Sequence, residues 1–309
     1  MGKKILIYFS IHSGINIFVK MKIRFRIAVL FLLFIGFFTK SHAQGNSLLW
    51  EISGNGLTDS SYLYGTIHIR DKRVFELGDS TYNAINRSKA LFGELNLHDK
   101  AAMKEHASDI LMPAGATLES LLSAEDYALV KKYCKKHIGV YALLMNKIKP
   151  IYLSAVISED LLKKEEKKPL DLYLQDYAVK QGKAIGGIET FEEQIKVLDM
   201  LSIQEQADML VEQVKNIEEE KKLMEYMLQL YLSESLDSLE ILVQQDTLSA
   251  EFNEALLDAR NNVMAQRMET QMKKQSTFFA VGAAHLPGQK GLVLLLRKEG
   301  YTVRPVKRK

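Results

Sequence analysis

The sequence is poor in the residues that lock a chain covalently or break its secondary structure. It contains one cysteine, Cys134, and five prolines among 309 residues, so no disulfide can form within the chain. No repeat or low-complexity linker divides it. Stability must therefore come from a packed core, and a hydrophobic content of 47% suffices for one large domain or two small ones. Cys134 itself is expected to be a buried helix residue.

Several well-known catalytic signatures are also missing. The chain has no His-Glu-x-x-His motif, no paired-cysteine motif, no Gly-x-Ser-x-Gly elbow and no phosphate-binding glycine loop. These absences argue against zincin proteases, zinc fingers, α/β-hydrolases and nucleotide-binding enzymes.

Acidic residues are absent from the first 43 positions, which carry seven Lys or Arg. A basic stretch there precedes the twelve apolar residues 27–38, and Ser41 and Ala43 follow. This order is typical of a secretory signal peptide. A retained anchor is the alternative, but twelve residues are fewer than the roughly 20 that span a bilayer. We predict an N-terminal extension and signal peptide at 1–43, cleavage near Ala43, and a secreted, periplasmic product without a stable membrane anchor.

Removing those 43 residues reverses the sign of the net charge. The remaining 34 Lys and Arg face 38 Asp and Glu, which gives a net charge of −4 instead of the +3 of the whole chain. A protein of net negative charge has no electrostatic basis for binding nucleic acid, so no nucleic-acid partner is expected.

The pattern of apolar residues predicts an α/β fold. Short apolar runs bounded by turn residues predict strands at 48–52, 61–64, 90–95, 183–188, 277–281 and 301–306. Spacing of three to four residues predicts helices at 79–89, through most of 98–275 and at about 289–298, with Ser123 beginning one helix and Pro150 ending another. We therefore predict a central mixed β-sheet flanked by helices, with a long helical middle segment, in a single domain over 44–309.

Two short segments repeat one arrangement, Gly65-Thr66-Ile67-His68 and Gly282-Ala283-Ala284-His285, each after an apolar strand. We expect the glycine to let the backbone turn sharply, so that the histidine projects from the end of the strand. Strand ends meet when strands share a sheet, and imidazoles combined with carboxylates suit a divalent transition metal. The alternative is a pair of hydrogen-bonded structural histidines.

Glu94 strengthens the case for a site, because it directly follows the apolar run 90–93. Burying a carboxylate there is costly without a cation or a hydrogen-bond donor. The alternative is an outward-facing position on an edge strand. The remaining histidines of the folded region, at 98, 106 and 137, lie in polar helical surroundings and are expected at the surface.

Five blocks extend this pattern along the chain: Leu49-Trp50-Glu51-Ile52, 62–68, Gly187-Ile188-Glu189-Thr190 with Glu193-Gln194, Arg260-Asn261, and 281–288. Their order resembles that of the TraB/GumN family, which includes the Tiki proteins, and the resemblance spans about 48–306. It implies an α/β fold with a central sheet flanked by helices. The Tiki members further imply a metal-dependent protease that uses Mn or Co and in which both Gly-x-x-His histidines are essential.

Carried over to this chain, the resemblance implies that His68 and His285 are metal ligands or catalytic histidines. It makes Glu94 their acidic partner, which either binds the metal or takes a proton from water that the metal makes more acidic.

Three further residues have a functional and a structural interpretation. Glu189 follows a predicted strand and is assigned a catalytic role at the metal; alternatively it balances charge at a helix N-terminus. Arg260 is predicted to hold a substrate carboxylate or a developing oxyanion. The alternative is a salt bridge that fixes its helix. Asp171 is interpreted as a helix N-cap.

The sequence therefore predicts a metal-dependent hydrolase that cuts a peptide or a small amide or ester substrate, with Mn or Co as the ion and Zn as a further possibility. The helical segment 98–275 would wall the cleft and select the substrate. Two alternatives remain: a noncatalytic periplasmic protein that sequesters a peptide or signal molecule, and an esterase-type hydrolase.

Overall fold

The computed structural model describes residues 46–245 and 249–307. The signal peptide and cleavage position predicted for 1–43 lie outside the described residues, and the division of the chain at Ala43 stays a prediction. Within the described ranges, no helix combines the length and the apolar character that crossing a membrane requires.

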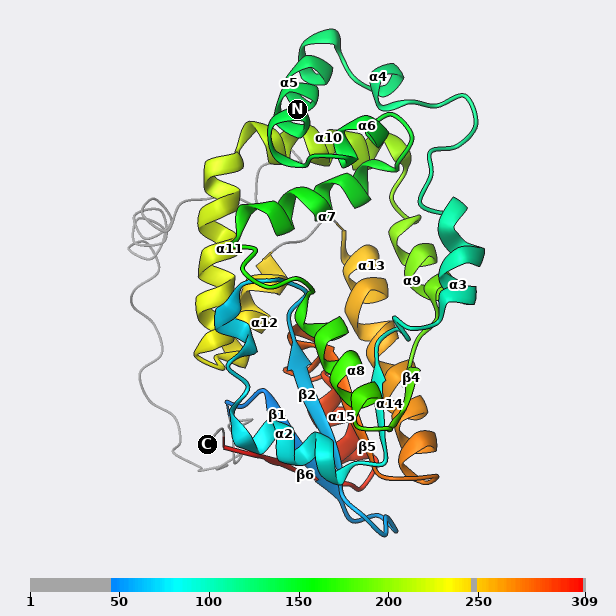
Figure 1. Cartoon of the computed structure of the whole chain (residues 1–309), viewed down its shortest axis with the longest axis vertical. Coiled ribbons are helices and arrows are strands. Elements are labelled where there is room, and N and C mark those ends of the chain that lie inside the picture. The colour runs from blue at the N-terminus through cyan, green and yellow to red at the C-terminus, as the bar shows by residue number, and fades with distance from the viewer. Residues whose placement is uncertain (1–45, 246–248, 308–309) are drawn as a thin grey trace, which may run out of the picture.

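A mixed sheet forms the base of the molecule (Figure 1). Within the described part of the chain it contains β1 (Leu49–Ser53), β2 (Ser61–Thr66), β3 (Ala90–Gly93), β4 (Ala184–Gly187), β5 (Thr277–Gly282) and β6 (Thr302–Pro305). Their spatial order is β4-β3-β5-β2-β1-β6. The strand β1 pairs antiparallel with both β2 and β6, whereas the neighbours β4, β3, β5 and β2 pair in parallel. The predicted mixed α/β sheet is thus confirmed.

Helices fill most of the remaining chain, as predicted. They are α2 (Gly78–Arg87), α3 (Lys100–Glu105), α4 (Leu118–Leu121), α5 (Ala124–His137), α6 (Tyr141–Leu144), α7 (Pro150–Leu161), α8 (Leu170–Lys180), α9 (Phe191–Leu198), α10 (Ile203–Lys215), α11 (Ile217–Leu232), α12 (Leu236–Gln245), α13 (Ala250–Asn253), α14 (Ala259–Met272) and α15 (Leu292–Lys298). A π-helical turn, η3 (Glu254–Asp258), leads directly into α14.

Two residues expected at helix ends have different outcomes. Ser123 caps α5 as predicted, since its side chain accepts a hydrogen bond from the Asp126 N–H. The prediction for Pro150 is wrong: it begins α7 instead of ending the preceding helix. The first turn of a helix leaves its N–H groups without partners, so a residue that has no N–H is well tolerated there.

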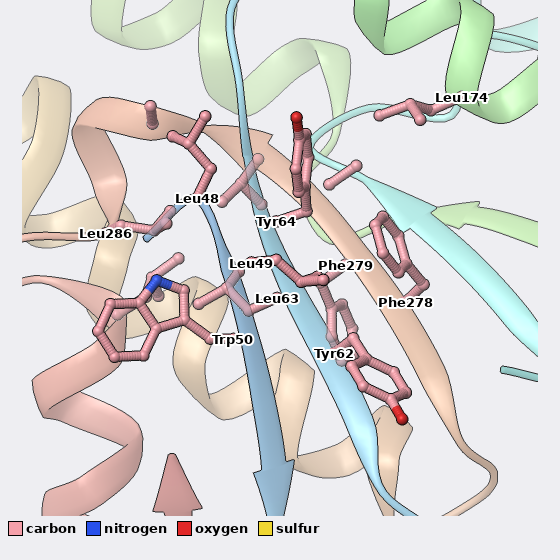
Figure 2. Close-up of a cluster of buried hydrophobic side chains, with 14 of the residues drawn as sticks. Leu48, Leu49, Trp50, Tyr62, Leu63, Tyr64, Leu174, Phe278, Phe279 and Leu286 are labelled. Atoms are coloured by element: carbon pink, nitrogen blue, oxygen red, sulfur yellow. The ribbon is translucent and has the colours of Figure 1, made fainter. Parts of the chain in front are cut away.

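The main hydrophobic core lies around the sheet. Tyr62 and Tyr64 from β2 lie beside Phe278 and Phe279 from β5, as Figure 2 shows, and the Tyr64 and Phe278 rings stack with their centroids 6.0 Å apart. Trp50 is fully buried, and its indole N–H donates to the Ser47 carbonyl at 2.7 Å. The parallel strands are therefore anchored by aromatic packing at their centre.

The helical middle segment has a second core of its own, built from α4, α5, α7 and α10. We call these helices together with α6 the helical lobe, which lies at the opposite end of the molecule from β6 (Figure 1). Cys134 is fully buried within this core as predicted, and burial raises the pKa of its thiol to about 11. Helix α11 reaches both cores, because Ile217 packs against the second and Tyr231 lies in the first.

Candidate active site at the carboxyl edge of the sheet

Parallel pairing brings the ends of four strands to one edge of the sheet. The strands β2, β3, β4 and β5 all end there, and each is followed within three residues by one of the predicted site residues. These are His68 after β2, Glu94 after β3, Glu189 after β4 and His285 after β5. In an open α/β sheet, the carboxyl edge of parallel strands is where binding sites form.

Glu94 and Glu189 share one guanidinium. Arg260, on α14, donates from Nε to Glu189 Oε1 at 2.8 Å and from its terminal nitrogen to Glu189 Oε2 at 2.6 Å and Glu94 Oε2 at 3.0 Å. The side-chain amide of Gln194 adds a bond of 3.1 Å to each carboxylate, and the Gly282 N–H donates to Glu94 Oε1 at 2.6 Å. The two carboxylates are thus held by donors from three elements, α14, α9 and β5.

Burial also shapes the charge of this cluster. The Glu189 side chain is only 2% exposed and that of Arg260 14%. Burial lowers the pKa of Arg260, but its hydrogen bond to Glu189 and the charges of both glutamates outweigh that effect and raise the pKa overall. The salt bridge that was one interpretation of Arg260 is therefore present. The roles of Arg260 and Glu189 toward a substrate or a metal stay predictions.

The conformational role predicted for the motif glycines is wrong. Gly282 has φ of −54°, and Gly65 is likewise outside the left-handed region. Glycine suits both positions because neighbouring atoms leave little room for a Cβ. A Cβ on Gly65 would lie 3.1 Å from the Ala283 Cα, and one on Gly282 would lie 3.1 Å from Glu94 Oε1. Both glycines allow neighbouring groups at the carboxyl edge to approach closely.

His285 is buried with a fixed orientation. Its Nδ1 lies 2.6 Å from Asn261 Oδ1, and the Asn261 amide in turn donates to the Lys290 carbonyl at 2.9 Å. Since the amide nitrogen is thereby used, the Asn261 oxygen accepts and His285 Nδ1 carries the proton. Burial lowers the pKa of His285, which favours the neutral ring. Its Nε2 is then free of hydrogen and faces Glu94 Oε1 at 3.6 Å.

His68 is held in the same way by a residue whose role the sequence did not reveal. Its Nδ1 lies 3.1 Å from Asp171 Oδ2, while Asp171 Oδ1 accepts a 2.5 Å bond from the Thr66 hydroxyl. Its side chain is 65% exposed, and the hydrogen bond to Asp171 raises the pKa of the ring. The prediction that Asp171 is an N-cap is wrong, because Pro169 occupies that position of α8. Asp171 instead orients the first motif histidine.

Three further histidines among the described residues each lie beside an acid that is not part of the cluster. His98 pairs with Asp176, His106 with Asp109 and His137 with Asp160. Of the predicted surface positions, His137 is exposed, whereas His98 and His106 are half-buried.

The fit of a metal ion can be tested on the donor atoms. Among the described residues, no three His, Cys, Asp or Glu side chains are gathered closely enough to hold an ion as they stand. Two donors are nevertheless prepared: His285 Nε2 and Glu94 Oε1 are 3.6 Å apart, and both can contact one ion at the usual distance of about 2.0–2.2 Å. The Nδ1 atoms of His285 and His68 are each held by an oxygen, as is usual for metal-binding histidines. The donor set fits a divalent ion, and His68 as its third ligand stays a prediction.

Fold and site together define an α/β protein with a carboxylate-arginine cluster and two oriented imidazoles at the carboxyl ends of parallel strands. The family model of the TraB/PrgY/gumN family matches residues 48–305, and the chain belongs to that family, which confirms the resemblance.

Among its relatives, metalloprotease TIKI2 of Danio rerio is 27% identical over 319 aligned positions, which cover 85% of this chain and 61% of the relative. Metalloprotease TIKI1 is 26% identical in Danio rerio, with coverage of 84% and 63%, and 24% identical in Homo sapiens, with coverage of 84% and 61%. The chain thus spans less than two thirds of these relatives. No solved structure gives a significant match.

Proposed function

We propose that this chain is a metal-dependent hydrolase that cuts a peptide or other amide bond. The observation that carries the proposal is the pairing of a neutral, oriented imidazole with a carboxylate: His285 Nε2 faces Glu94 Oε1 at 3.6 Å at the carboxyl edge. The relatives are named metalloproteases, which supports the same class of reaction. We also propose export to the periplasm as a single domain over 44–309, after cleavage near Ala43.

In this proposal His285, Glu94 and His68 hold a divalent ion, with Mn or Co favoured by the family resemblance and Zn as the further possibility. When bound, such an ion polarises a carbonyl and makes water more acidic. The chain supplies the orientation of the donors: the Asn261 oxygen keeps the proton of His285 on Nδ1, and Asp171 does the same for His68. Both Nε2 atoms then point away from their supports.

Glu94 has two alternative roles in this proposal: it either binds the ion or accepts a proton from the attacking water. Its Oε2 is engaged by Arg260 and Gln194, whereas its Oε1 accepts from the Gly282 N–H and faces His285. Fixed donors hold this carboxylate in place, which either role requires.

Arg260 and Glu189 complete the proposed chemistry. The Glu189 carboxylate takes two of the hydrogen bonds of Arg260, so the guanidinium is kept rigid beside Glu94. A fixed cation there is suited to stabilise negative charge on the carbonyl oxygen or to hold a substrate carboxylate. The helical lobe, beyond the carboxyl edge, would restrict which peptides reach the site.

The test combines metal content with hydrolysis of a peptide library. The wild type is compared with His285→Ala and His68→Ala after chelation and reloading with Mn, Co or Zn. The matched control is His106→Ala, a half-buried histidine that pairs with Asp109 outside the cluster. We expect stoichiometric metal and hydrolysis in the wild type and the control, and loss of both in the two variants while all four proteins stay folded. Peptide binding without turnover and without metal in the wild type would instead identify a noncatalytic binding protein.

A further inference from the structure

An exposed apolar patch lies on the helical lobe. Four of the five residues from 140 to 144 are large, apolar and exposed: Val140 by 65%, Tyr141 by 44%, Leu143 by 81% and Leu144 by 39%. We call these four residues the apolar tip. The neighbouring Met145 is buried and Ala142 packs against the second core, so the segment is held in place while its other side chains face outward.

A further exposed apolar residue comes from another part of the chain. Leu111 is 44% exposed and forms an isolated antiparallel bridge with Ile148, four residues beyond the apolar tip. The other exposed large hydrophobic residues of the described chain are well separated from one another in sequence. Single exposed apolar residues are ordinary, whereas a contiguous group marks a contact surface.

The segment that carries the apolar tip is basic in sequence. Residues 127–158 contain six lysines and neither Asp nor Glu, although acids outnumber bases over 44–309. Four of these lysines are exposed and form no ion pair with any described residue: Lys132, Lys135 and Lys136 on α5, and Lys147 just after α6. The other two differ: Lys149 is buried and bound to Asp199 at 2.6 Å, and the half-buried Lys131 lies over the Tyr127 ring.

Acids from neighbouring elements lie on one side of this basic surface, where Asp160 and Glu218 line a surface pocket together with Lys132 and Lys136. Asp160 is already paired with Lys164 and His137. Glu119 contacts the segment that carries the apolar tip through its backbone, because its N–H donates to Asn146 Oδ1 at 3.2 Å. An apolar group bordered by unpaired lysines complements a surface that is apolar inside and anionic outside.

We propose that the apolar tip and its lysines dock this protein on an anionic lipid bilayer. Val140, Leu143 and Leu144 would enter the boundary between headgroups and acyl chains, Tyr141 would lie at headgroup level, and the lysines would contact lipid phosphates. A membrane surface explains both observations, because it takes apolar side chains and positive charge within one contact. The patch belongs to the helical lobe, so this proposal is independent of the hydrolase chemistry at the sheet.

The test is flotation with lipid vesicles. The full chain is expressed in a bacterial host, purified as that host processes it, and its N-terminus is read by mass spectrometry. Vesicles of phosphatidylcholine alone are compared with vesicles containing about 30% phosphatidylglycerol, at low salt and at about 0.5 M salt. We expect flotation with the anionic vesicles, and high salt should weaken it.

Two double variants test the two parts of the surface. Val140→Asp with Leu143→Asp removes the apolar contact, and its matched control places the same changes at the exposed Ile241 and Val263. Lys135→Glu with Lys136→Glu reverses the charge, and its control reverses the exposed Lys180 and Lys274. We call these two double variants, without their controls, the tip variants. Each should partition at least about tenfold less to anionic vesicles than the wild type. The controls should bind like the wild type, with unchanged thermal unfolding in all four.

Three results would overturn the proposal. The first is a wild type that partitions equally to both kinds of vesicle. The second is a loss of partitioning in the tip variants that is no larger than the loss in their controls. The third is a dimer in sedimentation velocity that dissociates in the variant with Val140→Asp and Leu143→Asp, without lipid binding by the wild type, because the tip would then be covered by a second copy of this chain.

Discussion

Replacing Arg260 by methionine is the sharpest test of the carboxyl-edge cluster. Methionine keeps most of the apolar stem and removes the guanidinium that Glu189 and Glu94 share. Glu189 is 2% exposed, so its charge would be left buried with Gln194 as its remaining side-chain donor. Removing one partner of a buried ion pair costs about 3–5 kcal/mol, and we expect Arg260→Met to lower the free energy of unfolding by that amount.

The same helix supplies a matched control. Arg267 is also on α14 and pairs with Glu193 at 2.6 Å, but the two side chains are 41% and 38% exposed. An exposed ion pair contributes about 0.2–1 kcal/mol. Arg267 also donates to the Ile188 carbonyl at 2.8 Å, and a hydrogen bond of this kind adds about 1 kcal/mol. Arg267→Met should therefore cost at most about 2 kcal/mol, although the same charge is lost.

Urea unfolding followed by circular dichroism measures both values, and adding Glu189→Gln to Arg260→Met isolates the cause. Because the neutral amide leaves no buried charge at that position, we expect the double variant to recover about half or more of the loss. A divalent ion should also stabilise Arg260→Met more than the wild type, since two carboxylates are then uncompensated. If Arg260→Met costs no more than Arg267→Met, the electrostatic account of this cluster is refuted.

Two further predictions concern the titration of the motif histidines. Asp171→Asn should lower the pKa of His68, because the hydrogen bond to the carboxylate that raises this pKa is weakened. An NMR titration of the His68 ring measures the change, and an unchanged pKa would show that Asp171 has no such role. Burial lowers the pKa of His285 below its usual 6.5. At a pH just below 6.5, His285 therefore binds a proton in the unfolded chain more readily than in the folded chain. Stability should consequently fall as the pH drops below about 6.5, and unfolding at pH 7 and pH 5 should show a smaller loss in His285→Gln than in the wild type.

The strands that position the site could be predicted from sequence because each is a short apolar run bounded by turn residues. Once β2 and β5 are placed side by side in parallel, the convergence of His68 and His285 at one edge follows from the sheet. The parallel pairs β3–β5 and β3–β4 then bring Glu94 and Glu189 to the same edge. The two Gly-x-x-His segments therefore indicate the site from the sequence alone.

Contacts between distant residues with ordinary local surroundings were not predictable. Asp171 is an acid in the first turn of α8, a position that favours acids for purely local reasons, and its partner His68 is 103 residues away in sequence. Arg260 and Asn261 drew notice through a family block, but their partners Glu189 and His285 depend on how α14 packs against the sheet. Periodicity predicts that a helix exists and says little about which polar face meets a distant carboxylate.

Alanine substitutions at two strand-end glycines should have different effects: one should lower the stability of the fold, and the other should weaken metal binding at the site. A Cβ at Gly187 would lie 2.7 Å from the backbone nitrogen of Asn96, so Gly187→Ala must shift the main chain and should destabilise the protein by about 1–3 kcal/mol. At Gly282 the nearest atom is Glu94 Oε1 at 3.1 Å, and a side-chain carboxylate can move away. Gly282→Ala should therefore change stability by less than about 1 kcal/mol, yet weaken metal binding, because Glu94 loses its short bond to the Gly282 N–H and its position beside His285. If both alanine variants unfold alike in urea while Gly282→Ala keeps wild-type metal affinity, Glu94 is not positioned by this contact and the proposed ligand set fails.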